Sequence, residues 1–347
     1  MKEIKYYEQV DRQNMRRLRA LLDEFPEYCT RYFIALEITT ASRTRIAYGY
    51  DLRTFFTYLL DTKPECAGMK MRDIPISVIE NVGAQEIEAY VSHLRLYEKD
   101  GMEYANSARG IKRKLASLRS FYNYFFSNDL ISTNPAAKVK MPKIPKKQVI
   151  KLDKNEMRHL LNEVESGSGL TARQKSFHEK TKTRDMALMM LLLGTGIRVS
   201  ECAGLNMDDV DVDYAMGIRI HRKGGAEVVV YFNYEVRDAL KDYYEECTRM
   251  TPNEGSRDAF FLSLKGDRMS VRSIESTVKK YASCVTLKTI TPHKLRSTFG
   301  TALYRECKDI KLVADTLGNT IDVCNSYYVA MDKENRKNAP GFISLRG

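Results

Sequence analysis

The sequence predicts a mainly α-helical protein with a small β-sheet, folded as two domains. Apolar residues recur at helical spacing over most of the 347 residues, while one short stretch is rich in β-forming residues. Residues 138–153 interrupt this pattern with two prolines, repeated lysines and no periodicity, which is typical of an extended linker. We therefore expect an N-terminal extension (residues 1–26), a helical domain (27–137) and, after the linker, a second domain (154–347).

Two long helices are expected in the first domain. One apolar stripe begins at Ser42 and continues to Leu60, and another runs from Ser107 to Phe125, each with the spacing of one buried helix face. Shorter amphipathic segments between Ile74 and Tyr97 would complete a small helical bundle.

The second of these helices also has basic faces, and the linker adds further lysines. The candidate DNA-binding cations of the helix are Arg109, Lys112, Arg113 and Arg119. The linker lysines are Lys143, Lys146 and Lys147. Most charged runs are simply solvated, whereas basic segments can also lie against DNA phosphates, and the pattern of charges leaves both interpretations open.

Composition limits the partners and the environment of the protein. A net charge of +11 and a pI near 9.1 favour a polyanionic partner, with nucleic acid as the first candidate. The seven cysteines are scattered without a C-x-x-C pair, so neither disulfides nor a structural zinc site is indicated. No segment has the roughly 18 consecutive apolar residues of a membrane span. The charged N-terminus is unlike a signal peptide, so we expect a soluble, cytoplasmic protein without a membrane partner.

The second domain begins with helical patterns and then changes to a hairpin. An apolar run leads into Gly194–Glu201, whose sequence GTGIRVSE places Arg198 where the chain should leave a core helix. Two β-rich runs, Gly217–His221 and Val228–Tyr231, flank a Gly-Gly turn and predict a hairpin with Lys223 at its tip. Helical patterns then return.

A predicted helix start brings two candidate phosphate ligands together. Threonine caps helices and proline suits the first helical position, so Thr291-Pro292 predicts a helix with a buried stripe that includes Leu295. His293 and Arg296 then stand three residues apart, on one side of the helix and away from that stripe. Exposed N–H groups beside an arginine and a histidine would form a phosphate site; alternatively, both side chains merely face solvent.

Taken in order along the chain, these motifs resemble those of the tyrosine recombinase (phage integrase) family. The matching residues are Gly196-Ile197-Arg198-Val199-Ser200-Glu201, Lys223, His293 with Arg296, Leu317-Gly318-Asn319, and Tyr328. Within the family, the chain most resembles the Xer branch and its single-recombinase XerS type. Four segments carry this likeness: Phe25-Pro26-Glu27-Tyr28, Arg222-Lys223-Gly224-Gly225, Thr291-Pro292-His293-Lys294-Leu295-Arg296 and Lys337-Asn338-Ala339. The resemblance implies an N-terminal SAM-like helical bundle that binds DNA, followed by an α/β tyrosine-recombinase catalytic domain.

The resemblance also implies catalytic roles for these residues. Arg198 and Arg296 would hold the scissile phosphate, and His293 would orient a phosphate oxygen or accept the proton of the nucleophile. Lys223 would protonate the leaving 5′ oxygen, with Arg222 as its rival by position.

Tyr328 would be the nucleophile of such a site. Its attack on phosphorus would give a 3′-phosphotyrosine that keeps the bond energy, so the resemblance implies no metal, ATP or other cofactor. Tyr327 is the competing candidate and is expected to be a core or packing aromatic. Arg198 also has a structural interpretation, in which it pairs with Glu201 or Asp209 near a helix end.

Asn319 departs from the family pattern, which usually has histidine or tryptophan there. Asparagine can donate a hydrogen bond to a phosphate oxygen, but it cannot donate as a cation or transfer a proton near neutral pH. A second histidine that often follows the arginine of the H-x-x-R motif is replaced by Ser297. Since single contacts of this kind contribute about 2–4 kcal/mol to transition-state stabilisation, we expect slower cleavage rather than none.

The function implied by the resemblance is site-specific recombination of double-stranded DNA at an inverted-repeat core site. A homodimer would bind one site and a homotetramer would form the synapse, with an accessory protein or translocase as a further candidate partner. The biological role would be Xer-type chromosome-dimer resolution, or integration and excision of a mobile element. Two alternatives stay open: a DNA-binding protein of the same fold with weakened catalysis, and a type IB topoisomerase-like nicking enzyme.

Overall fold

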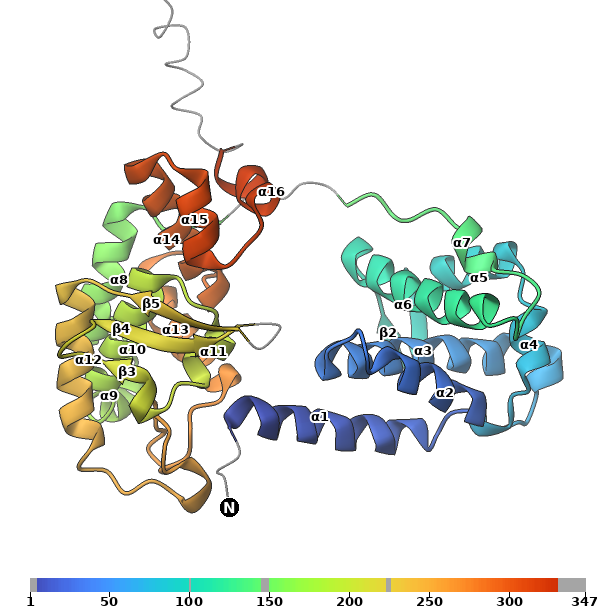
Figure 1. Cartoon of the computed structure of the whole chain (residues 1–347), viewed down its shortest axis with the longest axis horizontal. Helices are drawn as coiled ribbons and strands as arrows, with labels where there is room; N and C mark the ends of the chain where they lie inside the picture. Colours follow the sequence, from blue (N-terminus) through green and yellow to red (C-terminus); the bar gives the residue numbers. More distant parts are fainter. Residues whose placement is uncertain (1–4, 100, 145–149, 223–225, 330–347) are drawn as a thin grey trace, which may run out of the picture. The chain divides into compact units, whose positions relative to one another are not determined.

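Helices build most of the chain in the computed structural model, in agreement with the sequence-based prediction (Figure 1). The structure describes residues 5–99, 101–144, 150–222 and 226–329. The chain divides into two units, residues 1–146 and 147–347. Within the described residues, the strands form one two-stranded and one three-stranded sheet, so the predicted small sheet is confirmed.

The first unit is a helical bundle with one short hairpin. Its elements are α1 (Tyr6–Leu22), α2 (Glu27–Leu36), α3 (Ser42–Thr62), η1 (Pro64–Cys66), η2 (Met71–Asp73), α4 (Ile76–Glu80), α5 (Ala84–His93), β1 (Tyr97–Lys99), β2 (Met102–Tyr104), α6 (Ala108–Ser127) and α7 (Pro135–Lys138). The two helices predicted from apolar stripes are α3 and α6, and Ser107 caps α6 by accepting a hydrogen bond from the Gly110 N–H. The hairpin β1–β2 was not expected.

Aromatic rings fill the core between α3 and α6. Phe55 and Phe56 from α3 and Phe121 and Phe125 from α6 are fully buried. The rings of Phe56 and Phe121 meet edge to face with centroids 6.0 Å apart, which is a favoured aromatic geometry. These contacts fix the two helices against each other and leave the charged faces of α6 outside the core.

Helix α1 packs into the first unit, although its sequence was expected to form an extension. Its Leu18 and Leu21 are buried, and a Cβ at Gly49 of α3 would lie 2.7 Å from Leu21 Cδ2. The missing side chain at Gly49 therefore lets the two helices approach closely. Ser42 Oγ also donates to Asp11 Oδ1 at 2.6 Å. Four arginines in α1 dilute its apolar stripe, which is why the pattern does not reveal the packing.

The predicted linker is anchored in a core on both sides. Val139 is buried in the first unit. Leu152 is buried in the second unit, where its N–H donates to Thr298 Oγ1 at 3.0 Å. Between these anchors Lys143 is exposed, and residues 145–149 lie outside the described part of the chain.

The second unit is built around the buried helix α10. Its elements are α8 (Lys154–Ser166), α9 (Ala172–His178), α10 (Lys182–Thr195), α11 (Val199–Ala203), η3 (Met207–Asp209), β3 (Val210–Asp211), β4 (Gly217–His221), β5 (Glu227–Tyr231), α12 (Tyr234–Cys247), η4 (Glu254–Ser256), α13 (Val271–Val285), α14 (Pro292–Cys307), α15 (Ile310–Leu317), α16 (Ile321–Cys324) and η5 (Asn325–Val329). Helices α8, α12 and α14 pack against α10, which explains why α10 is apolar on nearly all sides (Figure 1).

The predicted hairpin is formed by β4 and β5, which pair antiparallel in a sheet of order β3-β4-β5. Ile218 and Ile220 point into the core while Arg219 between them is exposed, as the alternation of a strand requires. The register pairs His221 with Glu227 at the open end. Residues 223–225, with Lys223, lie outside the described residues.

The turn after α10 brings three helices together. Gly196 ends α10 with φ +62°, a left-handed conformation that glycine adopts without strain. A Cβ at this position would lie 2.5 Å from Phe299 Cδ1 of α14 and 2.9 Å from Leu317 Cδ2 of α15. Only glycine therefore lets α14 and α15 approach this turn, which leads directly to Arg198.

Candidate active site

Arg198 lies between α10 and α11, where it caps the second helix. Its backbone N–H donates to Glu201 Oε2 at 2.7 Å, and its Nη1 donates to Glu201 Oε1 at 2.8 Å. Its Nη2 donates to the Gly318 carbonyl, at the end of α15, at 2.9 Å. The pair with Glu201 agrees with the structural interpretation of this arginine, yet 39% of the Arg198 side chain stays exposed. Since a guanidinium has five N–H donors, donors remain for a further ligand.

Arg296 belongs to the first turns of α14 and is buried, whereas the helical spacing predicted a position away from the buried stripe. Its Nη1 donates to the Gly196 carbonyl at 2.6 Å, and its Nη2 donates to the Leu317 carbonyl. The same Nη2 donates to Asn319 Oδ1 at 3.2 Å. These three acceptors are neutral, so their hydrogen bonds hold the buried guanidinium without adding a negative charge beside it.

Asn319 connects the two arginines. Its Oδ1 accepts from Arg296 and also lies 3.5 Å from Arg198 Nη2. Its backbone N–H donates to the Ala314 carbonyl at 3.0 Å, which fixes Asn319 at the end of α15. The structure therefore brings three of the residues selected from the sequence into one hydrogen-bonded group.

Arg222, the last described residue before the hairpin tip, reaches the same helix end. Its Nη1 donates to the Asp315 carbonyl at 3.2 Å and its Nη2 to the Thr316 carbonyl at 2.7 Å. Burial lowers the pKa of Arg222; the Glu201 carboxylate opposes this shift, and the Arg198 guanidinium adds to it.

The last three carbonyls of α15 and that of its cap Gly318 thus each accept a hydrogen bond from an arginine. A helix leaves these last carbonyls without partners of their own, and they form the negative end of its dipole. We call this group of Arg198, Arg222, Arg296 and Asn319 at the end of α15 the arginine cluster. The Glu201 carboxylate pairs with Arg198, and the other described acceptors of the cluster are carbonyl and amide oxygens, so the arginine cluster is suited to receive an anion.

His293 lies in the first turn of α14, one turn before Arg296. Its side chain is exposed, in contrast to Arg296. Desolvation by the surrounding chain lowers the pKa of His293, and the positive charges of Lys294, Arg296 and Arg198 lower it further. The imidazole is therefore neutral at pH 7, the form that can accept a proton.

Tyr328 lies in η5, a π-helical turn that packs beside α16 and α14. The backbone of this turn thus lies next to the helix that provides Arg296. The neighbouring Tyr327 is 41% exposed, so it is not a core residue. Lys223, the predicted general acid, lies outside the described residues.

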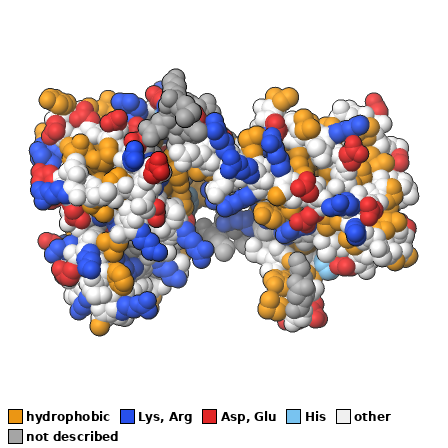
Figure 2. Space-filling view, turned by 90° about the horizontal axis from the view of Figure 1, so that it is seen from below, with side chains coloured by type: hydrophobic (Ala, Val, Ile, Leu, Met, Phe, Trp, Pro, Cys, Tyr) orange, Lys and Arg blue, Asp and Glu red, His pale blue; other side chains and the backbone are white. Residues whose placement is uncertain are grey.

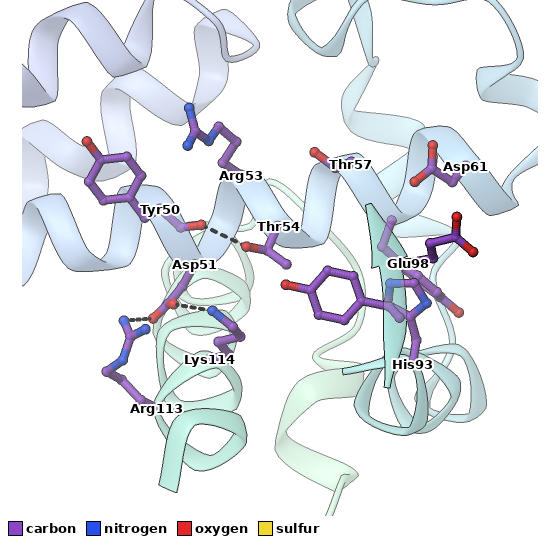
Figure 3. Close-up of a pocket in the computed structure, with 12 residues that line it drawn as sticks. Tyr50, Asp51, Arg53, Thr54, Thr57, Asp61, His93, Glu98, Arg113 and Lys114 are labelled. Carbon is purple, nitrogen blue, oxygen red and sulfur yellow. Dashed lines mark hydrogen bonds and ion pairs between the residues drawn. The ribbon is translucent and has the colours of Figure 1, made fainter. Parts of the chain in front are cut away.

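In the first unit, a buried carboxylate holds two of the basic side chains of α6 (Figure 3). Asp51 of α3 has no exposed side-chain surface and accepts hydrogen bonds from Arg113 Nη1 and from Lys114 Nζ at 3.2 Å. These three residues line a cavity of about 210 Å³, and Tyr50 and His93 also line it. Burial raises the pKa of Asp51, and the two cations oppose that shift.

The other predicted DNA-binding residues of α6 differ in their surroundings. Arg109 and Lys112 are exposed. Arg119 instead donates from Nε to the Ala136 carbonyl at 3.0 Å and from Nη2 to the Val139 carbonyl, so it fastens the chain after α7. Arg119 therefore has a structural role that the sequence did not reveal.

Basic side chains are also spread over the surface of both units. Figure 2 shows Lys and Arg side chains on both units, interspersed with acidic and hydrophobic ones on the face in view. Lys143 is exposed, and Lys146 and Lys147 lie outside the described residues. Among the residues that the structure describes, no group of His, Cys, Asp and Glu side chains could hold a metal ion. No helix in the described ranges is both long and apolar enough to cross a bilayer.

Sequence reasoning missed two parts of the arginine cluster. Arg222 was expected only as a rival of Lys223, although its tertiary contact is with α15. The carbonyl groups of α15 carry no sequence signal, because every residue has one. The helix end could have been inferred only from the glycine at position 318, whose φ of +57° is typical of a helix cap.

Comparisons with known proteins agree with this geometry. The model of the phage integrase family matches residues 151–335, more than half of the chain. Tyrosine recombinase XerC of Caldanaerobacter subterraneus subsp. tengcongensis is 30% identical over 331 residues, which cover 92% of this chain and 85% of that protein. Tyrosine recombinase XerS of Lactococcus lactis subsp. cremoris is 27% identical over 351 residues, which cover 94% and 97%.

Solved structures share the fold at lower identity. A XerH site-specific recombinase bound to its difH substrate in a pre-cleavage complex has a TM-score of 0.61 and 19% identity, covering 86% of this chain and 79% of that chain. The Tn1549 transposon integrase in complex with circular intermediate DNA has a TM-score of 0.62 and 20% identity, covering 90% and 98%. The chain therefore belongs to the phage integrase family, and tyrosine recombinases of the Xer type are its relatives over nearly its whole length.

Proposed function

We propose that this tyrosine recombinase cleaves and rejoins double-stranded DNA at a specific site through a 3′-phosphotyrosine intermediate. The observation that carries the proposal is the convergence of Arg198, Arg296 and Asn319 on one helix end, in a chain of the phage integrase family. The Xer recombinases that match most of the chain support it.

The arginine cluster would bind the scissile phosphate. Arg198 is partly exposed and keeps N–H donors, so it can bind a non-bridging phosphate oxygen directly. Arg296 is held by carbonyl groups and adds a second positive charge beside that oxygen. Because these donors are fixed before the substrate arrives, little reorganisation is needed when charge develops on the five-coordinate phosphorus.

Cleavage would then exchange one phosphoester bond for another. The Tyr328 oxygen forms a bond to phosphorus while the bond to the 5′ oxygen breaks, and the DNA 3′ end stays linked to the protein. The phenol has an ordinary pKa of about 10 and must lose its proton, while the 5′ oxygen must gain one. Lys223 is the proposed donor of that second proton. Rejoining reverses these steps with a 5′ hydroxyl from the partner strand.

His293 would accept the phenol proton or hold a phosphate oxygen. Its lowered pKa keeps the ring neutral in the free protein, so it is ready to act as a base near pH 7. A bound phosphate would raise this pKa, because the negative charge favours the protonated ring. Proton transfer to His293 therefore becomes easier when DNA is in place.

Asn319 would act mainly through the arginines. Its oxygen accepts from Arg296 and approaches Arg198, so it holds both guanidiniums in one orientation. The histidine or tryptophan typical of the family would instead donate to the phosphate. We expect a functional active site with slower cleavage than a histidine at this position would give.

The first unit and the linker would hold the duplex. Arg109 and Lys112 are exposed on α6 and are the main candidates for phosphate contacts. Arg113 contributes a half-exposed guanidinium that Asp51 fixes in place. We also propose backbone contacts by three linker lysines: Lys143, Lys146 and Lys147. Arg119 is engaged with carbonyl groups of the same unit and is a weak candidate.

Assembly on DNA is the next level of the proposal. Matching structures of lambda integrase show a dimer on a core site and a tetramer on a Holliday junction. By analogy, we infer that two copies bind an inverted-repeat core site and four form the synapse. The cellular task is then Xer-type dimer resolution or movement of a genetic element, under control of an accessory protein or translocase.

One observation favours a second candidate function. Asn319 replaces a residue that usually donates to the phosphate, which would suit a DNA-binding protein with weakened catalysis. The arginine cluster argues against this candidate, because neutral acceptors preserve the charge that transition-state stabilisation needs. A topoisomerase-like nicking enzyme would share the chemistry but would cleave without a defined repeat.

Covalent capture on genomic DNA tests the proposal and identifies the site in the same experiment. Purified protein is incubated with sheared host DNA and EDTA, the mixture is denatured with detergent, and DNA that remains attached to protein is sequenced. We expect fragments that share an inverted repeat around a short spacer. DNA that is bound before denaturation but never retained afterwards would support the binding-protein candidate. Retention without a shared sequence, together with relaxation of supercoiled plasmid, would support the topoisomerase-like candidate.

A further inference from the structure

The side chain of Arg222 contacts a helix that is distant from its own hairpin in the sequence. Its two terminal nitrogens both donate to carbonyl groups of α15, 93 and 94 residues further along the chain. Its Nε is buried and has no hydrogen-bond partner among the described residues. A buried donor without a partner costs free energy. The two hydrogen bonds to α15 therefore form at the cost of leaving one buried donor of the same guanidinium unpaired among the described residues.

The seat for this guanidinium is closely fitted. A Cβ on Gly318 would lie 2.3 Å from Arg222 Nη1 and 2.6 Å from its Cζ, so glycine at this cap leaves the space that Arg222 fills. Arg222 also stands in the field of Arg198, whose positive charge lowers its pKa. A third cation beside two others is unfavourable unless negative groups compensate for it, and the Glu201 carboxylate and the negative end of α15 both do so.

Arg222 is also well fixed to its own hairpin. Its backbone N–H donates to the Ala226 carbonyl at 2.9 Å, one step beyond the β4–β5 pair of His221 and Glu227. The neighbouring arginine of the strand, Arg219, is exposed instead. The side chain of Arg222 therefore joins a closed hairpin to the helix end that holds Arg198 and Arg296.

We propose that Arg222 is a positioning residue for DNA cleavage, which fastens the β4–β5 hairpin to the carboxyl-terminal end of α15 and so allows the leaving 5′ oxygen to be protonated. The inference rests on the proposed function. Lys223, the proposed proton donor, follows Arg222 by one peptide bond, so fixing Arg222 restricts the reach of Lys223 by covalent geometry alone. Arg222 itself supplies no proton in this account.

The chemistry of the leaving group provides a specific test. In ordinary DNA, the Tyr328 oxygen bonds to phosphorus, the bond to the 5′ oxygen breaks, and that oxygen takes a proton. If sulfur replaces the bridging 5′ oxygen, the thiolate leaves without a proton, because its conjugate acid is far stronger than an alcohol. A defect in leaving-group protonation is therefore relieved by sulfur, whereas a defect in phosphate activation or folding is not.

The experiment compares Arg222→Met, Arg222→Lys and the matched control Arg219→Met as full-length proteins. Single-turnover cleavage is measured on nicked suicide duplexes that carry the captured site, with oxygen or sulfur at the bridging position, and duplex binding is measured by fluorescence anisotropy. We expect Arg222→Met to bind DNA within about twofold of wild type and to cleave the oxygen substrate about 10²-fold more slowly, the usual size of an acid–base contribution. The sulfur substrate should restore its rate to nearly that of wild type.

The remaining variants make the outcome decisive. Arg222→Lys should recover part of the oxygen-substrate rate, since an ammonium can still donate to the α15 carbonyls, and Arg219→Met should cleave like wild type. The inference is overturned if Arg222→Met cleaves the oxygen substrate normally, or if sulfur leaves its defect unchanged. Wild type that forms no adduct on a bound site would instead reject the proposed function itself, and the two failures are thus distinguishable.

Discussion

Asp51 of the first unit and the arginine cluster of the second unit illustrate two different ways of fixing a cation inside a protein. In the first unit, Arg113 and Lys114 share the buried carboxylate of Asp51. In the second unit, Arg296 is held by carbonyl groups and one amide oxygen. A carboxylate neutralises most of the charge that it fixes, whereas a carbonyl fixes a cation and leaves its charge intact.

This difference shows what each kind of site can contribute to DNA chemistry. Gripping a duplex requires exposed cations that exchange with the counterions of DNA, and their exact orientation matters little. Stabilising a transition state requires cations that are oriented in advance and not neutralised. The carboxyl-terminal end of a helix meets the second requirement, because it offers several acceptors without a formal charge.

The largest effects are expected from removing either phosphate-binding arginine. Arg198→Met and Arg296→Met should each slow single-turnover cleavage by about 10²–10³-fold, the usual loss for one transition-state donor. DNA binding should change much less, because most of the affinity comes from other phosphate contacts. Arg296→Met should also lower the free energy of unfolding by about 1–3 kcal/mol, since buried carbonyls lose their donor.

Urea unfolding of the two variants separates these effects. If Arg198→Met destabilises the protein as much as Arg296→Met, the distinction between an exposed ligand-binding arginine and a buried one is incorrect. If neither variant slows cleavage, the arginine cluster is not the phosphate site.

The next effect concerns pH. Because the pKa of His293 is lowered from its ordinary 6.5 in the folded protein, unfolded chains bind more protons just below that value, and stability rises with pH up to about 6.5. Cleavage that uses the neutral ring should likewise decline as pH falls through the lowered pKa. His293→Gln should lose this pH limb and cleave about 10²-fold more slowly at pH 7.5. Cleavage rates of wild type and His293→Gln, measured from pH 5 to 8, check the decline at low pH and the loss of rate at pH 7.5. An unchanged decline at low pH in the variant would exclude His293 as its source.

A smaller gain is expected at Asn319. The change Asn319→His adds a donor that can carry positive charge toward the phosphate, so cleavage should become up to about tenfold faster. Asn319→Ala serves as the control, because it removes the amide oxygen that Arg296 and Arg198 approach. Slower cleavage by Asn319→His would mean that holding the arginines is the main task of this residue.

The smallest effects should come from the surface of α6. The double variant Arg109→Gln with Lys112→Gln should reduce the salt dependence of DNA binding by a slope of about 1.8, or about 0.9 for each lost phosphate contact. Arg119→Met should leave that slope unchanged and instead lower stability by about 1–2 kcal/mol, because its carbonyl partners lose a donor. Binding titrations at several salt concentrations give the slope for the double variant and for Arg119→Met. Thermal unfolding of the same two proteins gives their stabilities. A reduced salt dependence of DNA binding in Arg119→Met would mean that Arg119 contacts a DNA phosphate.

Local patterns explain most of what the sequence predicted correctly. The stripes of α3 and α6 and the β4–β5 hairpin depend on spacing and turn residues, which are visible in a short window. Helix α1 was missed because its packing depends on Gly49 of another helix. The hairpin β1–β2 has a local signal in the pair Asp100-Gly101, which is typical of a two-residue hairpin turn.

The active site could be predicted only in part, for a related reason. Side chains such as Arg198, His293 and Arg296 stand in recognisable motifs, so their identities could be selected. Their partners are backbone carbonyls of α15, which any sequence would supply. The role of Arg222 depends on a contact across more than 90 residues, and no spacing rule reports such a contact.

Covalent trapping with assignment of the linked residue tests the central claim most directly. Wild type, Tyr328→Phe and Tyr327→Phe are incubated with EDTA on a nicked suicide duplex that carries the captured site, and the adduct is digested and sequenced by mass spectrometry. The account predicts an adduct in wild type and in Tyr327→Phe, with the DNA 3′ phosphate on Tyr328, and none in Tyr328→Phe. An adduct on the exposed Tyr327, or no wild-type adduct on DNA that the protein demonstrably binds, would contradict it.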